Sequence, residues 1–137
     1  SVSIPVFANG DIDSVEKSLE VLRLSNADGL MIGRAAQGRP WIFQELAFGL
    51  GKTSAKPQLE KNFLRDMMLG HLNELHRFYG EQTGVRVARK HLTWYSGYLA
   101  NAEEFRYRVV RVDSASEQLQ MTRQYFDRPD GGVCLAA

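Results

Sequence analysis

Short apolar runs and amphipathic stretches alternate along the first 50 residues of this chain. Residues 4–8 and 29–32 are apolar runs rich in β-forming residues, and glycine-containing turns follow both. Runs of this length between turn residues predict strands, and apolar residues on both faces are typical of buried parallel strands. The sequence therefore predicts two short buried strands in this part of the chain.

A helical pattern follows each predicted strand. Asp13 with Glu16 has the spacing of a capping box and predicts a helix that ends near Leu24. Pro40 suits the first position of a shorter helix that stops at Gly49–Gly51. This order is typical of parallel α/β folds, but two strands cannot cover their own edges. We therefore expect this half to need partner strands that the sequence does not contain.

The rest of the chain is predicted to be helical. Apolar residues recur at steps of three and four over 59–79, 84–99, 102–112 and 114–126. Ser114 and Glu117 form a second capping box. The predicted chain is α/β plus all-α and mostly helical overall, with an α/β piece (1–52), a linker (53–58), a helical domain (59–127) and a loose tail (128–137).

Composition narrows the class of protein. Among 137 residues, 44% are hydrophobic and 24% are charged, so the chain has enough apolar surface to fold. The only cysteine is Cys134, which excludes a disulfide scaffold and fits a reducing, cytoplasmic location. We find no apolar run long enough to span a membrane and no secretory leader. The first residues lack Met and already read as a strand, so we expect a piece of a longer protein.

The turns after the two predicted strands are the first candidate site. They contain Asn9, Gly10 and Asp11 in one case and Gly33 and Arg34 in the other. Ligands of parallel α/β proteins bind at the carboxyl ends of strands, where glycine admits close approach and arginine matches phosphate oxygens. The pair of turns is a candidate phosphate cradle. The alternative is that both glycines only permit tight turns, and spacing alone leaves it open.

A basic segment is the second candidate. The net charge of the whole chain is only +1, yet residues 85–111 hold six arginines and lysines against two glutamates. Within the predicted helix from Val85, the polar face carries Arg86, Arg89 and Lys90, with His91 at its flank. Cations without acidic neighbours favour an anionic partner, and Trp94, Tyr95 and Tyr98 offer rings for base stacking. On residue types alone, a solvated helix face with core aromatics is the favoured alternative.

Other reactive residue types give no site. His71 and His76 lie five residues apart and therefore on different helix faces, and no cysteine or carboxylate completes a metal-ligand pattern around them or His91. Cys134 has no nearby histidine to activate it as a nucleophile. We therefore expect no metal site and no catalytic residue within this sequence.

Three stretches taken together resemble the C-terminal part of bacterial tRNA-dihydrouridine synthases, particularly the B group. They are IPVFANGDI at 4–12, ADGLMIGRAAQGRPWIF at 27–43, and GVRVARKHL at 84–92 followed by Trp94 and Tyr95. The resemblance extends from about residue 3 to residue 126. It implies that residues 1–52 supply the last two βα units of an FMN-binding TIM (β/α)₈ barrel, followed by a helical tRNA-binding domain.

The resemblance also implies roles for particular residues. Asn9, Gly10, Asp11, Gly33 and Arg34 would bind FMN around its phosphate. Arg86, Arg89, Lys90 and His91 would contact tRNA, with weaker contacts from Arg106, Arg108 and Arg111. Members of this family reduce the C5–C6 bond of uridine with NADPH as the reductant. Their catalytic cysteine lies in an earlier barrel segment, so we expect this chain alone to be inactive.

Two alternatives remain open at this point. One is a non-catalytic helical RNA-binding module, and the other is a piece of a different FMN-dependent TIM-barrel oxidoreductase. If the N-terminal barrel portion is missing, orphan strand edges should seek partners. We therefore expect residues 1–52 to be disordered, rearranged or paired with another copy of the chain.

Overall fold

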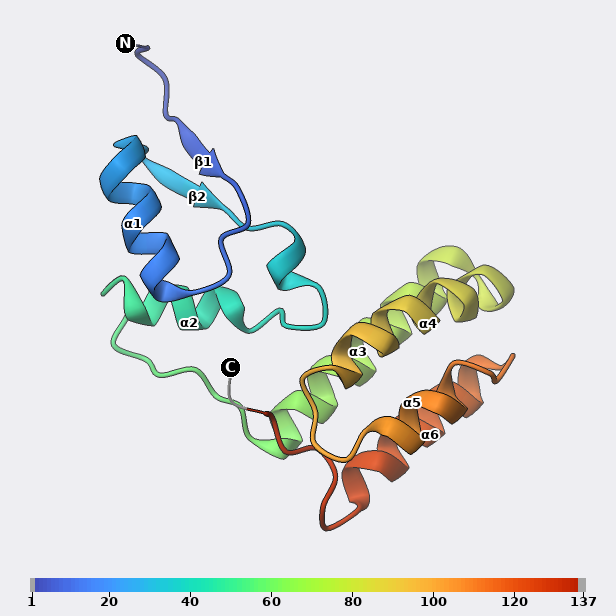
Figure 1. Cartoon of the computed structure of the whole chain (residues 1–137). Helices are drawn as coiled ribbons and strands as arrows, with labels where there is room; N and C mark the ends of the chain where they lie inside the picture. The colour runs from blue at the N-terminus through green and yellow to red at the C-terminus, as the bar shows by residue number, and fades with distance from the viewer. Residues whose placement is uncertain (1, 136–137) are drawn as a thin grey trace. The chain divides into compact units, whose positions relative to one another are not determined.

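The computed structural model describes residues 2–135 and divides the chain into two compact units (Figure 1). Unit 1 comprises Ser1–Pro57 and unit 2 comprises Gln58–Ala137. The boundary between them falls within residues 53–58, the segment that the sequence predicts to be a linker. Each unit is described by itself below.

Unit 1 contains a single βαβ element followed by short helices. Its strands are β1 (Phe7–Asn9) and β2 (Gly29–Met31), which pair in parallel with Phe7 opposite Gly29 and Asn9 opposite Met31. Helix α1 (Val15–Ser25) connects them; a three-residue 3₁₀ turn (Arg34–Ala36) and α2 (Ile42–Gly49) follow. The predicted element order is therefore confirmed. The expectation that this segment would be disordered or rearranged is wrong, because the parallel pair forms.

The starts of the helices in unit 1 differ from the prediction. The N-cap of α1 is Ser14 and not Asp13, because the Ser14 hydroxyl accepts a hydrogen bond from the Lys17 amide at 3.2 Å. Helix α2 begins at Ile42, so Pro40 precedes it instead of opening it. Both errors move a boundary by one or two residues and leave the order of elements unchanged.

The strands of unit 1 are exposed, although the sequence predicts buried ones. Phe7 of β1 is 65% exposed and Met31 of β2 is 59% exposed. The buried apolar side chains of this unit are Ile12, Trp41, Ile42 and Leu46. The physical reason is that two strands and two helices provide too few layers to cover both faces of the strand pair. The apolar character of these strands therefore suits a larger sheet.

Unit 2 is formed by four helices around a common core (Figure 1). These helices are α3 (Lys61–Tyr79), α4 (Glu81–Ser96), α5 (Glu103–Val109) and α6 (Ala115–Asp127). Helix α3 packs on α4 and α6, and α5 packs on the same two helices. The predicted capping role of Ser114 is confirmed, because its hydroxyl accepts a hydrogen bond from the Glu117 amide at 3.4 Å. Fully buried apolar side chains from all four helices fill the core, among them Leu72, Leu92, Val109 and Phe126.

Close backbone contact joins α3 to α4. Helix α4 starts at Glu81, three residues before the predicted start, so Gly84 lies inside it. A Cβ atom added at Gly84 would stand 2.8 Å from the His76 Cα and 2.9 Å from the Leu75 carbonyl oxygen. Only glycine permits this approach of the two backbones. The same pair of helices is tied to α6 by Gln118, whose amide donates to the Val85 carbonyl (3.1 Å) and accepts from the His76 ring (2.9 Å).

The C-terminal segment is attached to the helical core and is not the loose tail that we predicted. Leu99 and Cys134 form an antiparallel bridge, and the Leu135 amide donates to the Tyr98 carbonyl at 2.8 Å. The Ala100 amide donates to the Val133 carbonyl at 2.9 Å. Backbone pairing of this kind cannot be read from a composition of glycine and small residues. Residues 136 and 137 of the predicted tail lie outside the described residues.

Within residues 2–135, no helix combines the length and apolarity needed to cross a membrane.

Candidate functional site

The two predicted ligand-binding turns lie at the same edge of the strand pair. Because β1 and β2 are parallel, with Asn9 opposite Met31, the turns that follow the two strands start from the same edge of the pair. There the guanidinium of Arg34 forms an ion pair with the carboxylate of Asp11. The structure therefore brings the two turns together, as the sequence argument requires. Both side chains are open to solvent, with 78% of Arg34 and 73% of Asp11 exposed.

The backbone at the first turn requires its glycine. Gly10 has φ of +145°, a conformation that side chains rarely tolerate, and Asp11 follows at +43°. Gly33 of the second turn has φ of −105° and ψ of −106°. A Cβ added at either glycine would meet nothing within 4 Å. The surface beside both turns is therefore open to a ligand.

The chemistry of these turns suits a ligand with both phosphate and hydroxyl groups. An exposed ion pair contributes roughly 0–1 kcal/mol, so Arg34 can exchange Asp11 for a phosphate at little cost. The Asp11 carboxylate can then accept hydrogen bonds from hydroxyl groups. Only three residues of 3₁₀ helix follow Gly33, so the second turn has no α-helix N-terminus to attract an anion. Attraction of an anion there depends on Arg34.

The basic residues of α4 divide into two separate groups, of which Arg86 and Arg89 form the first. They line one cavity of about 410 Å³ together with Asp113. Arg89 donates to the Val112 carbonyl at 3.1 Å and forms an ion pair with Asp113, and its side chain is 32% exposed. Arg89 therefore holds the α5–α6 connection, whereas Arg86 is exposed.

Lys90 and His91 form the second group and contact aromatic rings. The Lys90 ammonium lies 4.9 Å from the centre of the Trp94 ring, and the His91 ring lies 4.7 Å from that of His71. Burial lowers the pKa of His91 below its usual value of 6.5, and the neighbouring charges of His71 and Lys90 lower it further. His91 is thus neutral at pH 7 and adds no positive charge for phosphate binding.

The predicted stacking rings also differ in their accessibility. Tyr95 is 2% exposed and belongs to the core, so the alternative interpretation holds for it. Its hydroxyl shares a hydrogen bond of 3.0 Å with the His71 Nδ1, and burial raises the pKa of Tyr95 to about 12. Trp94 and Tyr98 are half-buried. Helix α4 therefore offers a smaller stacking surface than the sequence suggests.

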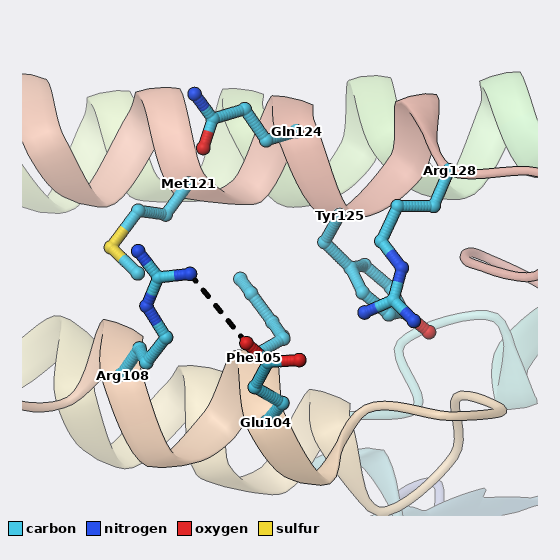
Figure 2. Close-up of a pocket in the computed structure, with 7 residues that line it drawn as sticks. All are labelled: Glu104, Phe105, Arg108, Met121, Gln124, Tyr125 and Arg128. Atoms are coloured by element: carbon cyan, nitrogen blue, oxygen red, sulfur yellow. Dashed lines mark ion pairs between the residues drawn. The ribbon is translucent and has the colours of Figure 1, made fainter.

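A cavity that the sequence argument missed lies between α5 and α6. Figure 2 shows its seven lining residues, with Arg108 extending from α5 toward Met121 of α6. This cavity measures about 300 Å³ and adjoins a second one of about 480 Å³, with which it shares Arg108, Met121 and Gln124. We call the two cavities together the α5–α6 groove. Its remaining lining residues are Glu104, Phe105, Tyr107, Arg111, Val112, Glu117, Gln120, Tyr125 and Arg128.

The sequence holds a signal for the groove. Gln120 and Gln124 are one helical turn apart on α6, Arg108 lies on α5, and Arg111 lies in the turn that follows α5. Polar rows on two adjacent helices face one another when the helices are antiparallel. Among the described residues, no group of three histidine, cysteine, aspartate or glutamate side chains is arranged to hold a metal ion.

Comparison with known proteins identifies a matching family. The family model described as dihydrouridine synthase matches residues 1–129. The chain is 51% identical over 133 residues to tRNA-dihydrouridine synthase B of Xanthomonas axonopodis pv. citri, covering 97% of this chain and 40% of that protein. It is 50% identical over 127 residues to tRNA-dihydrouridine synthase B of Vibrio cholerae, covering 93% of this chain and 39% of the relative.

A third relative covers the whole chain. It is tRNA-dihydrouridine synthase B of Pseudomonas aeruginosa, which is 48% identical over 138 residues, equal to 100% of this chain and 42% of that protein. The chain thus spans about two fifths of the length of the relatives that it matches. The more specific expectation that it corresponds to their C-terminal part stays a prediction.

Proposed function

Because this chain belongs to the dihydrouridine synthase family, we propose that it is part of a flavin-dependent enzyme that reduces uridine in tRNA. In this proposal unit 1 contributes two βα units to an FMN-binding barrel and unit 2 binds tRNA. FMN supplies the hydride for the uridine C5–C6 bond after its own reduction by NADPH. Because the proposed substrate is tRNA, we expect the enzyme to be cytoplasmic.

The observation that supports the cofactor site is the meeting of Asp11 and Arg34 across two parallel strand ends. In the proposal Arg34 binds the FMN phosphate through its fork of N–H donors. Asn9 and Asp11 accept hydrogen bonds from the ribityl hydroxyls, while Gly10 and Gly33 let the cofactor approach the backbone. The open surface beside both glycines is consistent with this arrangement.

The exposed apolar strand residues support a barrel around unit 1. The side chains of Phe7 and Met31 are exposed to solvent, and their burial by further strands would stabilise the fold. The proposal therefore needs the part of the enzyme that this chain does not contain, including the cysteine that protonates the uridine ring. Cys134 does not match that residue, because it pairs through its backbone with Leu99 in unit 2.

The test compares this 137-residue chain with the complete gene product obtained by reading the coding frame upstream of Ser1. Each is incubated with FMN, NADPH and unmodified tRNA, and dihydrouridine is measured by mass spectrometry of the digested tRNA. We expect dihydrouridine from the complete protein and none from the shorter chain. Turnover by the shorter chain, or its absence from the complete protein, would contradict the proposal.

A second candidate function is that of an RNA-binding module without catalysis. The observation that favours it is that unit 2 has its own buried core of four helices. Under this alternative the chain binds tRNA while the complete gene product binds no flavin. The absorbance spectrum of the purified complete protein near 450 nm separates the two candidates.

A further inference from the structure

We propose that the α5–α6 groove of unit 2 binds one nucleotide of the RNA, with its phosphate on Arg108 and Arg111 and its base against Tyr107. This inference rests on the proposed function, because it takes RNA to be the partner of unit 2. It places a nucleotide site between α5 and α6, apart from the polar face of α4 that the sequence favours.

The dimensions of the groove suit a ligand of this size. Its two cavities measure about 300 and 480 Å³, and sites for small molecules are typically about 300–1,000 Å³. They adjoin one another along α5 and α6 and share Arg108 and Met121. The larger cavity is lined by Tyr107, Arg108 and Arg111 together, so a base and its phosphate can both be held there.

Arg108 and Arg111 are poorly neutralised by the protein, whereas Arg128 of the same groove is paired with Asp130 at 3.0 Å. The nearest carboxylate to Arg108 is Glu104, with nitrogen and oxygen 3.7 Å apart, and 61% and 71% of the two side chains are exposed. An exposed pair at this distance contributes little, so a phosphate can replace Glu104. Arg111 donates to the Tyr107 carbonyl, and its guanidinium lies 3.6 Å from the centre of the Tyr107 ring.

The stack of Arg111 on Tyr107 prepares a flat surface for a base. Tyr107 is 63% exposed, so its ring is accessible to a base. Bases of unstacked RNA pack on tyrosine rings and on the planes of arginine guanidinium groups. Because the guanidinium is already ordered by the ring, less side-chain entropy is lost on binding.

Neutral polar groups on α6 complete the groove. Gln120 and Gln124 both line it, and their amides carry donors and acceptors for the edge of a base. Met121 provides an apolar, adaptable surface between them. Glu117 also lines the groove, and its carboxylate can accept from a base amino group but opposes a phosphate nearby. The phosphate is therefore assigned to the arginine side of the groove.

Two of the four predicted contact residues of α4, Arg89 and His91, are less suited to this task. Arg89 is held by Val112 and Asp113, and the lowered pKa of His91 keeps that ring neutral. Recruitment of Arg89 to RNA would release the α5–α6 connection from its contact. The α5–α6 groove keeps its cations accessible without such a rearrangement.

The test measures tRNA affinity of the 137-residue chain by fluorescence anisotropy as a function of salt. The double variant Arg108→Ala/Arg111→Ala should weaken binding at least tenfold. It should also lower the slope of log K against log salt by about 1, as expected when the contacts to one phosphate are lost. The matched control, Arg23→Ala/Arg77→Ala, removes the same charge from exposed helix positions and should change affinity less than threefold. Circular dichroism verifies that both variants keep their helices.

A second variant separates recognition from charge alone. Arg108→Lys/Arg111→Lys keeps both positive charges but loses the planar guanidinium, so we expect about threefold to fivefold weaker binding with the salt slope preserved. Full affinity of this variant would overturn the stacking role of Arg111. Equal loss in the alanine and control variants, or no loss in either, would overturn the groove as the RNA site.

Photo-crosslinking tests the contact between RNA and the groove without requiring catalysis. tRNA containing 4-thiouridine should crosslink to peptides within residues 103–128, and crosslinks confined to α4 would overturn the proposal. If the complete protein forms no dihydrouridine but these crosslinks appear, the reaction is wrong and the groove stands. If dihydrouridine forms while the alanine variant binds normally, the groove is wrong and the reaction stands.

Discussion

The two units of this chain use apolar residues in opposite ways. In unit 2 the apolar positions of four helices meet in one core, where Leu72 and Leu92 are fully buried. In unit 1 the apolar strand residues face solvent, and Phe7 is 65% exposed. Helices can bury their apolar stripes against one another within 70 residues, whereas a parallel sheet needs several strands and covering helices. Apolar residues are therefore buried in the core of unit 2, whereas the apolar strand residues of unit 1 stay exposed.

The contrast has a functional consequence. The α5–α6 groove lies on a unit whose packing is complete, so its side chains have fixed supports. The turns with Asp11 and Arg34 lie on a unit whose strands are uncovered, and additional strands would fix their position. We therefore expect RNA contacts to be measurable on this chain and cofactor contacts to need the complete enzyme.

The largest expected effect tests the difference in burial directly. Leu72→Ala removes a fully buried side chain from unit 2 and should lower the free energy of unfolding by about 2–5 kcal/mol. Met31→Ala in unit 1 should change it by no more than about 0.5 kcal/mol, because Met31 is already 59% exposed. Urea denaturation followed by circular dichroism measures both. A similar loss in the two variants would mean that Met31 is buried in solution, as pairing with another copy would cause.

A smaller effect concerns the contact between α3 and α4. Gly84→Ala should cost about 1–3 kcal/mol, since its Cβ would stand 2.8 Å from the His76 Cα. Gly70→Ala is the matched control, because a Cβ there meets nothing within 4 Å and alanine is the better helix former. It should stabilise unit 2 by about 0.5–1 kcal/mol. Thermal unfolding of the two variants gives the comparison, and a stabilising Gly84→Ala would contradict the close approach.

The smallest effect is a dependence of stability on pH. Burial lowers the pKa of His71 below 6.5, and burial with nearby charges does the same for His91. The unfolded chain then binds more protons than the folded one below pH 6.5, so stability is full above that pH and falls as the solution is acidified toward the lowered pKa values. The double variant His71→Gln/His91→Gln should flatten this slope in urea titrations between pH 5 and pH 7. An unchanged slope would exclude these rings as its source.

The sequence predicted the order of elements better than their surroundings. Periodicity located all the main helices, because amphipathic spacing and caps such as Ser114 are local properties. It missed the exposure of the strands and the attachment of Cys134 to Leu99, since both depend on which distant segments are present. Gly84 shows the same limit, as a glycine inside a helix was interpreted as its boundary.

The candidate site was predicted in part for similar reasons. The turns with Asp11 and Arg34 follow strands, and parallel strands bring their ends together by rule. The accessibility of Arg89 and His91 could not be inferred, because it depends on Asp113 from the α5–α6 connection and on His71 from α3. The α5–α6 groove arises from the pairing of two helices and is visible only in three dimensions.

The most direct test of the account is the affinity of the complete gene product for FMN and for riboflavin, which lacks the phosphate. Charge-assisted hydrogen bonds contribute about 1.5–3 kcal/mol, so Arg34→Ala should weaken FMN binding at least tenfold. It should change riboflavin binding less than twofold, and the control Arg23→Ala should change neither. Equal effects of Arg34→Ala on the two flavins, or no effect on FMN, would contradict the assignment of these turns to the cofactor phosphate.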